Sequence, residues 1–279
     1  MRSGGGQWRL LFTGHGSGAW NMAVDEAMML LHAQGKIPPT IRFYQWEPPA
    51  VSLGYFQSWQ KEIDREACRR LSIDVVRRPT GGRAVLHHHE VTYSVVIRQE
   101  LLPGSILETY RQLSQGLLAG FVFLGVQAEM ASLERDRLRD GLPGRAAGAA
   151  CFDSPSWYEL LVEGRKVVGS AQVRKQETIL QHGSILLDLD VDLLMEVLAF
   201  PSPAVRTRTR RVLAGKAGSL RDYLGKEATF ERVSQAMAQG FAKALGIELI
   251  PADLQDEEKK LAEELAREKY AADWWLERA

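Results

Sequence analysis

The chain has 279 residues, 45% of them hydrophobic, and its 35 Lys and Arg balance 35 Asp and Glu. This composition can bury a substantial core, and the zero net charge gives no global field that would favour nucleic acid. Two cysteines are typical of a reducing compartment and argue against a disulfide scaffold. No apolar run reaches the roughly 20 residues that a membrane span needs, and a signal peptide is not recognisable. We expect a cytoplasmic monomer that binds neither nucleic acid nor membranes.

Strand and helix signals alternate along the first half of the chain. Asn21 is the expected N-cap of the first helix, with Asp25 and Glu26 in its early turns, where negative charge favours the helix dipole. Strands are expected at Trp8–Phe12, Thr40–Trp46, Val51–Gly54, Ile73–Arg77 and Glu90–Ile97, and helices at Met22–Gln34, Lys61–Leu71 and Ser105–Leu124.

The second half begins with a charged, glycine-containing segment, Arg135–Ala147, which indicates an exposed loop. A hairpin follows, with Glu163-Gly164 as the turn between strands Trp157–Val162 and Arg165–Ala171. Another strand is expected at Thr178–Leu187, and helices at Val191–Ala199, Phe230–Leu245 and Asp256–Arg267. The elements show no regular βαβ rhythm, so we expect an α+β protein with a mixed sheet and packed helices.

Cys151 and Lys166 are the parts of an activated nucleophile, because a nearby ammonium favours the thiolate. In the expected hairpin, however, Lys166 faces Leu161. Cys151 therefore reaches Lys166 only if residues 153–156 double back. The alternative is that Cys151 is a buried structural thiol. On the second strand, Gly169, Ser170 and Ala171 are small enough for a ligand to approach closely.

A Gly-Gly turn with flanking arginines is the second candidate site. Gly81 and Gly82 lie between Arg78 and Arg83, and His87 follows on the next strand. Such a turn lets backbone N–H groups line a cavity, which suits either a phosphate or the carbonyl of an acyl chain. A tight turn with solvated arginines is the structural alternative. The P-loop pattern GxxxxGKS/T is absent.

Two further motifs have simpler interpretations. The triplet His87–His89 lacks accompanying CxxC or HExxH ligands, and only its first and third members could share one strand face, so we expect no metal site. His87 then serves as a polar wall of the pocket. Arg206–Arg211, with the sequence RTRTRR, is expected to be a solvated charged face or a contact for an acidic protein partner.

The motifs together resemble the biotin/lipoate protein ligase superfamily and, within it, the cysteine-dependent octanoyltransferases of lipoate synthesis. The resemblance covers about residues 8–250. It rests on the segments NMAVDEA, IRFYQWEPPAVSLGYFQ, RRPTGGRAVLH followed by EVTYSV, CFDSPSWYEL, GRKVVGSAQ and LQHGSILLDLD, which occur in the family's order.

This resemblance implies one catalytic domain at 1–250, built around a mostly antiparallel sheet, followed by a C-terminal helical extension at 251–279. It implies transfer of an octanoyl group from octanoyl-acyl carrier protein to a lysine of a lipoyl domain, such as glycine cleavage H protein, without ATP or another cofactor. Cys151 matches the acyl-thioester nucleophile and Lys166 the lysine that lowers its pKa. Gly81, Gly82, Arg83 and His87 match the loop and strand that enclose the acyl chain.

Three alternatives remain at this point. The first is an ATP-dependent lipoate or biotin ligase on the same fold, and the second is an amidotransferase that moves octanoyl between lipoyl domains. The third is a non-catalytic protein that binds acyl chains or lipoyl domains. Cys151 together with Lys166 argues against the first and third alternatives but not against the second.

Overall fold

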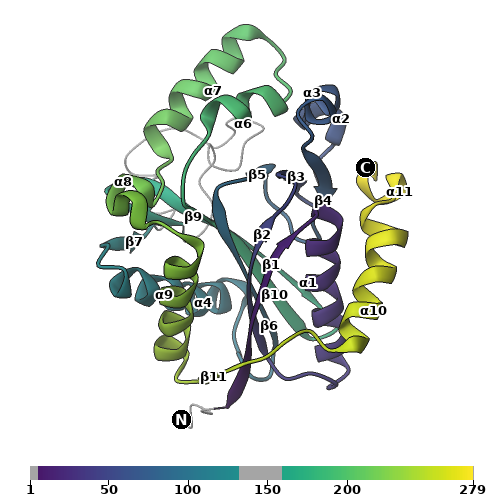
Figure 1. Cartoon of the computed structure of the whole chain (residues 1–279), viewed down its shortest axis with the longest axis vertical. Helices are drawn as coiled ribbons and strands as arrows, with labels where there is room; N and C mark the ends of the chain where they lie inside the picture. The colour runs from purple at the N-terminus through teal and green to yellow at the C-terminus, as the bar shows by residue number, and fades with distance from the viewer. Residues whose placement is uncertain (1–5, 132–158, 279) are drawn as a thin grey trace.

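The structure is a computed structural model, and it describes residues 6–131 and 159–278. A twisted eight-stranded sheet forms its centre (Figure 1). In spatial order, the strands are β11 (Glu248–Pro251), β1 (Gln7–Gly16), β2 (Thr40–Trp46), β6 (Glu90–Arg98), β10 (Thr178–Leu186), β9 (Arg165–Lys175), β8 (Leu160–Val162) and β7 (Ala128–Met130).

Pairing in this sheet is mostly antiparallel. Only β1 pairs in parallel, with β11 on one side and β2 on the other, and the remaining neighbours are antiparallel. The predicted mixed sheet with packed helices is therefore confirmed. A second sheet has three strands in the order β4 (Asp74–Arg77), β3 (Ala50–Leu53) and β5 (Val85–His87), and it lies at the upper end of the large sheet in Figure 1.

Helices cover both faces of the large sheet, with α4 and α9 on one face and α1 and α10 on the other (Figure 1). The helices are α1 (Gly18–Ala33), α2 (Trp59–Glu62), α3 (Arg65–Arg70), α4 (Ile106–Phe123), α6 (Val191–Val197), α7 (Pro203–Lys216), α8 (Arg221–Leu224), α9 (Phe230–Leu245), α10 (Asp256–Leu265) and α11 (Asp273–Leu276). Short helical turns lie at η2 (Gly225–Glu227) and η3 (Ala266–Tyr270). None of the helices within residues 6–131 and 159–278 is long and apolar enough to cross a membrane.

The predicted hairpin is confirmed. Glu163 and Gly164 both adopt positive φ, +50° and +77°, as a tight two-residue turn requires. Lys166 pairs with Leu161, as the predicted register has it. The pairing then shifts by one residue, since Leu160 lies opposite Val168, which leaves Val167 as the extra residue of a β-bulge.

Several helix predictions were wrong in detail. The first helix begins at Gly18, because Ser17 and not Asn21 caps it. The Asn21 amide instead donates to the carbonyls of Gly16 and Gln45. The single helix predicted from Lys61 to Leu71 is broken into α2 and α3, because Asp64 adopts an extended conformation and caps α3. The basic motif at 206–211, for which no helix was predicted, lies on α7. The loop predicted at 135–147 lies outside the described residues.

The C-terminal segment folds back along α1 and reaches β4 (Figure 1). Polar contacts with the N-terminal part of the chain hold it. Arg9 makes a bidentate ion pair with Glu258, at 2.6 and 2.8 Å, and Lys269 donates to both oxygens of Glu26. The Arg77 guanidinium donates to main-chain carbonyls of the last turn, including Leu276 at 2.6 Å. The domain boundary predicted at residue 250 stays a prediction.

Candidate active site

A cavity of about 210 Å³ lies between the large sheet and the small one. Apolar, aromatic and glycine residues make up half of its lining, and three large side chains form one wall: Met22 from α1 and Tyr44 and Trp46 from β2. The other lining residues are Ser52, Arg78, Gly82, Arg83, Val85, His87, Thr92, Gly169, Ser170, Ala171, His182, Gly183 and Ser184.

The alternation of side chains along β6 explains why polar groups reach this cavity. Val91, Tyr93 and Val95 pack into the core under α4 and α9. Thr92 and Ser94 therefore emerge on the opposite face. Strand register then places small and polar residues side by side across the sheet, in two neighbouring rows: Tyr44–Thr92–Ser184–Gly169 and Arg42–Ser94–His182–Ala171.

Asp25 of α1 organises the first buried polar network. It is fully buried and forms an ion pair with Arg42 at 2.8 Å. Its carboxylate also accepts hydrogen bonds from Tyr44 and Ser94. The Nδ1 atom of His182 lies 3.1 Å from the same carboxylate. Burial raises the pKa of Asp25, but the hydrogen bond from His182 and the Arg42 charge outweigh burial, so the pKa is lowered and the carboxylate is ionised.

His182 links this network to the glycine turn. Its Nε2 atom lies 2.7 Å from the hydroxyl of Thr80. Burial lowers the pKa of His182 although Asp25 opposes this effect, so the imidazole is neutral. A carboxylate only accepts hydrogen bonds, so Nδ1 donates to Asp25 and Nε2 accepts from Thr80.

A second network has the same plan. His87 Nδ1 lies 2.8 Å from Glu90, and His87 Nε2 lies 2.7 Å from the Ser52 hydroxyl. Glu90 also accepts from Thr92 and Ser184. Burial raises the pKa of Glu90, but the charge and hydrogen bond of His87 and these hydroxyl donors outweigh burial, so the pKa is lowered.

Both imidazoles are therefore saturated by groups of the protein itself. His87 also stacks on Trp46, with ring centroids 4.0 Å apart. A cavity wall whose polar atoms already have partners can accept a hydrocarbon chain without leaving a buried donor or acceptor unpaired. The cavity is therefore chemically suited to a hydrocarbon chain.

A close backbone approach and a positive φ explain the glycines at positions 54 and 82. A Cβ on Gly54 would lie 1.9 Å from the carbonyl oxygen of Gly82, and Gly82 itself has φ +97°. Arg78 holds this turn by donating to the carbonyls of Gly81 and Arg83, at 2.9 and 2.7 Å. A clear role of Arg78 is thus to fix the glycine turn.

The structure brings most of the predicted binding residues to one cavity. Gly81 does not line it, although its carbonyl accepts from Arg78. The predicted residues that do line it are Arg78, Gly82, Arg83, His87, Gly169, Ser170 and Ala171.

Lys166 is buried on β9, and its Nζ donates to Glu159 at 2.6 Å. The β-bulge at Val167 lies between Lys166 and Gly169. A bulge of one residue shifts the alternation of side chains along the strand, so the residues before and after it no longer follow one two-residue period.

Cys151 lies outside the described residues. The other cysteine, Cys68 on α3, is buried, and burial raises the pKa of its thiol to about 11. An ordinary buried thiol of this kind is inert.

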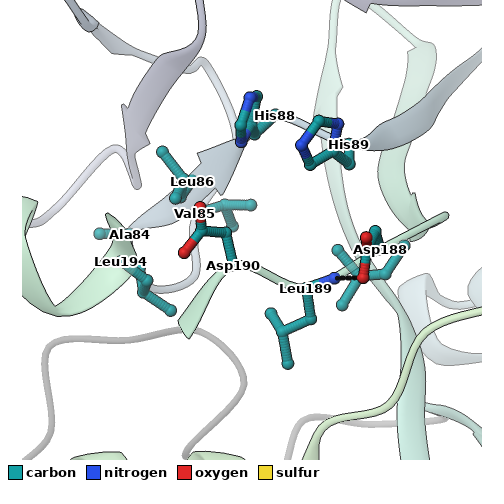
Figure 2. Close-up of a pocket in the computed structure, with 10 residues that line it drawn as sticks. Ala84, Val85, Leu86, His88, His89, Asp188, Leu189, Asp190 and Leu194 are labelled. Atoms are coloured by element: carbon teal, nitrogen blue, oxygen red, sulfur yellow. Dashed lines mark hydrogen bonds between the residues drawn. The ribbon is translucent and has the colours of Figure 1, made fainter. Parts of the chain in front are cut away.

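The neighbours of His87 face a different, much smaller cavity. Figure 2 shows His88 and His89 above Asp188 and Asp190. These side chains line a space of about 20 Å³. Within residues 6–131 and 159–278, no three His, Cys, Asp or Glu side chains are placed to hold a metal ion.

Sequence reasoning missed most of the polar wall. It assigned Asp25 to the helix dipole and predicted a strand at Glu90–Ile97 without singling out its polar side chains. It also did not single out Ser52 or Glu159. The alternation of Glu90, Thr92 and Ser94 with apolar residues was the available signal, since a strand buried on both faces has little reason to carry polar side chains.

Comparison with known proteins decides the family. The profile of the lipoyl protein ligase A/B catalytic domain matches residues 17–242. The chain belongs to this family. The resemblance to the biotin/lipoate protein ligase superfamily is therefore confirmed.

Among curated relatives, octanoyltransferase LipM of Kyrpidia tusciae is 54% identical over 271 residues, covering 96% of this chain and 97% of the relative. Octanoyltransferase LipM of Bacillus subtilis is 46% identical over 270 residues, with 96% and 97% covered.

Solved structures support the fold. A bi-partite lipoate protein ligase from Thermoplasma acidophilum aligns with a TM-score of 0.80 at 24% identity, covering 98% of each chain. Lipoate-protein ligase A bound with ATP aligns with a TM-score of 0.76 at 25% identity, covering 97% of this chain and 98% of the ligase. The expected catalytic-domain fold of the superfamily is confirmed.

Proposed function

We propose that this protein is an octanoyltransferase that moves an octanoyl group from the thioester of an acyl carrier protein to a lysine of a lipoyl domain. The observation that carries the proposal is the cavity, because its polar wall is internally saturated and its remaining lining suits a hydrocarbon chain. Two relatives that cover almost the whole chain, at 54% and 46% identity, bear the name octanoyltransferase.

The reaction that we propose has two steps. The thiolate of Cys151 attacks the octanoyl thioester, the carbon–sulfur bond to the carrier breaks, and the carrier leaves as a thiol after taking up a proton. The ε-amine of the acceptor lysine then attacks the acyl-enzyme. An amide forms, the amine loses a proton, and Cys151 is released. An activated thioester supplies the driving force, so the proposal requires neither ATP nor another cofactor.

In this reaction, the Lys166 ammonium would stabilise the thiolate, and main-chain N–H groups of β9 would stabilise the negative charge on the acyl oxygen. An ammonium near the thiol favours the thiolate, and Glu159 would hold the Lys166 side chain in one position. On β9, the Ser170 carbonyl accepts from the Tyr110 hydroxyl. Gly169, Ser170 and Ala171 all line the cavity, and their main-chain N–H groups are our candidates for the oxyanion donors.

The proposal includes glycine cleavage H protein as an acceptor, a cytoplasmic location and a monomeric state. The two-cysteine composition favours the cytoplasm. The structural similarity to lipoate-protein ligase A bound with ATP is the observation that supports a ligase as the second candidate. A ligase would activate free octanoate or lipoate with ATP and would not require Cys151.

Intact-mass measurement after mixing the protein with octanoyl-acyl carrier protein, without nucleotide, tests the proposal. We expect an octanoyl adduct on wild type and on Cys68→Ala, and none on Cys151→Ala. Transfer to H protein should follow. An adduct on Cys68, or transfer that strictly requires ATP, would contradict the proposal. Octanoylated lipoyl domain used as donor identifies an amidotransferase if it acylates Cys151 faster than the carrier does.

A further inference from the structure

The basic helix α7 uses its arginines in two different ways. Arg206 forms an ion pair with Glu196 at 2.8 Å, and Arg210 with Asp192 at 2.5 Å. These acids lie four residues apart on α6, as the two arginines do on α7. Two of the four arginines in the motif are thus engaged in packing α7 against α6.

Arg208 and Arg211 lie on the outer side of the same helix. Thr209 and Leu213 are its buried residues, and at 100° per residue Arg208 and Arg211 lie about 100° and 160° from Thr209. Both are exposed, and neither has an ion-pair partner among the residues that the structure describes. The side chains around them on this face are small: Ala204, Thr207, Ala214 and Gly215.

The end of α7 is fixed to the strand that carries Lys166. Ala217 follows the helix directly and pairs with Lys166, and the Gly218 N–H donates to the Lys166 carbonyl at 3.0 Å. At 1.5 Å per residue, Arg211 lies about 9 Å and Arg208 about 14 Å along the helix from this junction.

We infer that the outer face of α7, defined by Arg208 and Arg211, is the docking surface for the acyl donor, an acidic carrier protein whose thioester stands on a long flexible prosthetic arm. The surface is complementary in charge to such a carrier and protrudes because its neighbours are small. A donor bound about 9–14 Å along the helix from the junction needs a long arm to reach the proposed site beside Lys166. A lysine side chain of an acceptor is too short for this distance.

The inference rests on the proposed octanoyl transfer, so the experiment separates the two. Acylation of the full chain is followed with the octanoylated carrier and, separately, with octanoyl-pantetheine, a small thioester that cannot use the docking surface. For Arg208→Glu/Arg211→Glu we expect kcat/KM with the carrier to fall on the order of tenfold at low salt, and kcat/KM with octanoyl-pantetheine to stay unchanged. Added salt should slow the wild type much more than the variant.

Lys260→Glu/Arg267→Glu is the matched control, because it alters the net charge by the same amount on the exposed side of the C-terminal segment, away from α7 (Figure 1). It should retain wild-type rates with both donors. An equal loss of kcat/KM with both donors in Arg208→Glu/Arg211→Glu would overturn the inference. An unchanged kcat/KM with the octanoylated carrier would overturn it as well. Slower transfer from pre-acylated enzyme to H protein, with normal acylation, would assign the surface to the acceptor instead. Failure of both donors on wild type would reject the proposed function itself.

Discussion

Two ion pairs of the same length show how differently this molecule uses charge. Asp25 and Arg42 are 2.8 Å apart beside the cavity, and both are completely buried. Glu196 and Arg206 are also 2.8 Å apart, between α6 and α7, but each remains 48% exposed. The distance is the same, whereas the solvent around the charges is not.

The difference is energetic. A buried charge that loses its partner cannot be solvated by water, so every member of the Asp25 network depends on the others. The charges of an exposed pair are well solvated whether they are paired or apart, so the pair contributes little to the free energy of unfolding. We therefore expect the cavity wall to be rigid and sensitive to substitution. The α7 surface should tolerate substitution with little change in the free energy of unfolding, and it remains available to a partner.

The largest expected effect follows from removal of Asp25. Asp25→Ala would leave the Arg42 guanidinium buried without its carboxylate and would deprive His182 and Tyr44 of their acceptor. We expect the free energy of unfolding to fall by about 3–5 kcal/mol. Urea titration of wild type and variant measures the change. A loss below about 1 kcal/mol would mean that the two ion pairs do not differ as proposed.

An intermediate effect is expected from pH. The pKa values of Asp25 and Glu90 are lowered in the fold from 3.8 and 4.5, and that of His182 is lowered from 6.5. For each group, the unfolded chain binds more protons than the folded protein at pH values between the folded-state and unfolded-state pKa. The free energy of unfolding therefore falls as the pH falls through this range. The histidine contribution is lost below about pH 6.5 and the carboxylate contributions below about pH 4.5.

Urea midpoints from pH 8 to 4 check this order. Burial also lowers the pKa of His32 and His88, so His182→Asn should flatten the decline between pH 7 and 5 only in part. A slope identical to that of wild type would show that His182 does not titrate with folding.

The smallest effect is expected on α7. Arg206→Ala should lower the free energy of unfolding by less than about 1 kcal/mol, because its pair with Glu196 is half exposed and screened by salt. Urea titration at low and high salt measures this, and the difference from wild type should shrink at high salt. A loss comparable to that of Asp25→Ala would remove the contrast between the two regions.

Local signals in the sequence determined much of the fold. Glu163-Gly164 specified the hairpin, and with it the pairing of Lys166 with Leu161, because a two-residue turn fixes strand register. Amphipathic periodicity located α9 at Phe230–Leu245 without error. The order of the motifs also identified the superfamily, and the glycine turn and β9, both singled out from the sequence, contribute residues to the cavity lining.

Only the tertiary structure decided which polar residues meet. Asp25, Arg42 and His182 come from α1, β2 and β10, and no pattern within any one of these elements shows that their side chains share one buried site. The sequence likewise could not show that Arg78 fixes the glycine turn, or that α7 divides its arginines between α6 and solvent. The reason is physical: turns and helices follow from neighbouring residues, whereas the partner of a buried charge depends on strand register and helix packing across the whole chain.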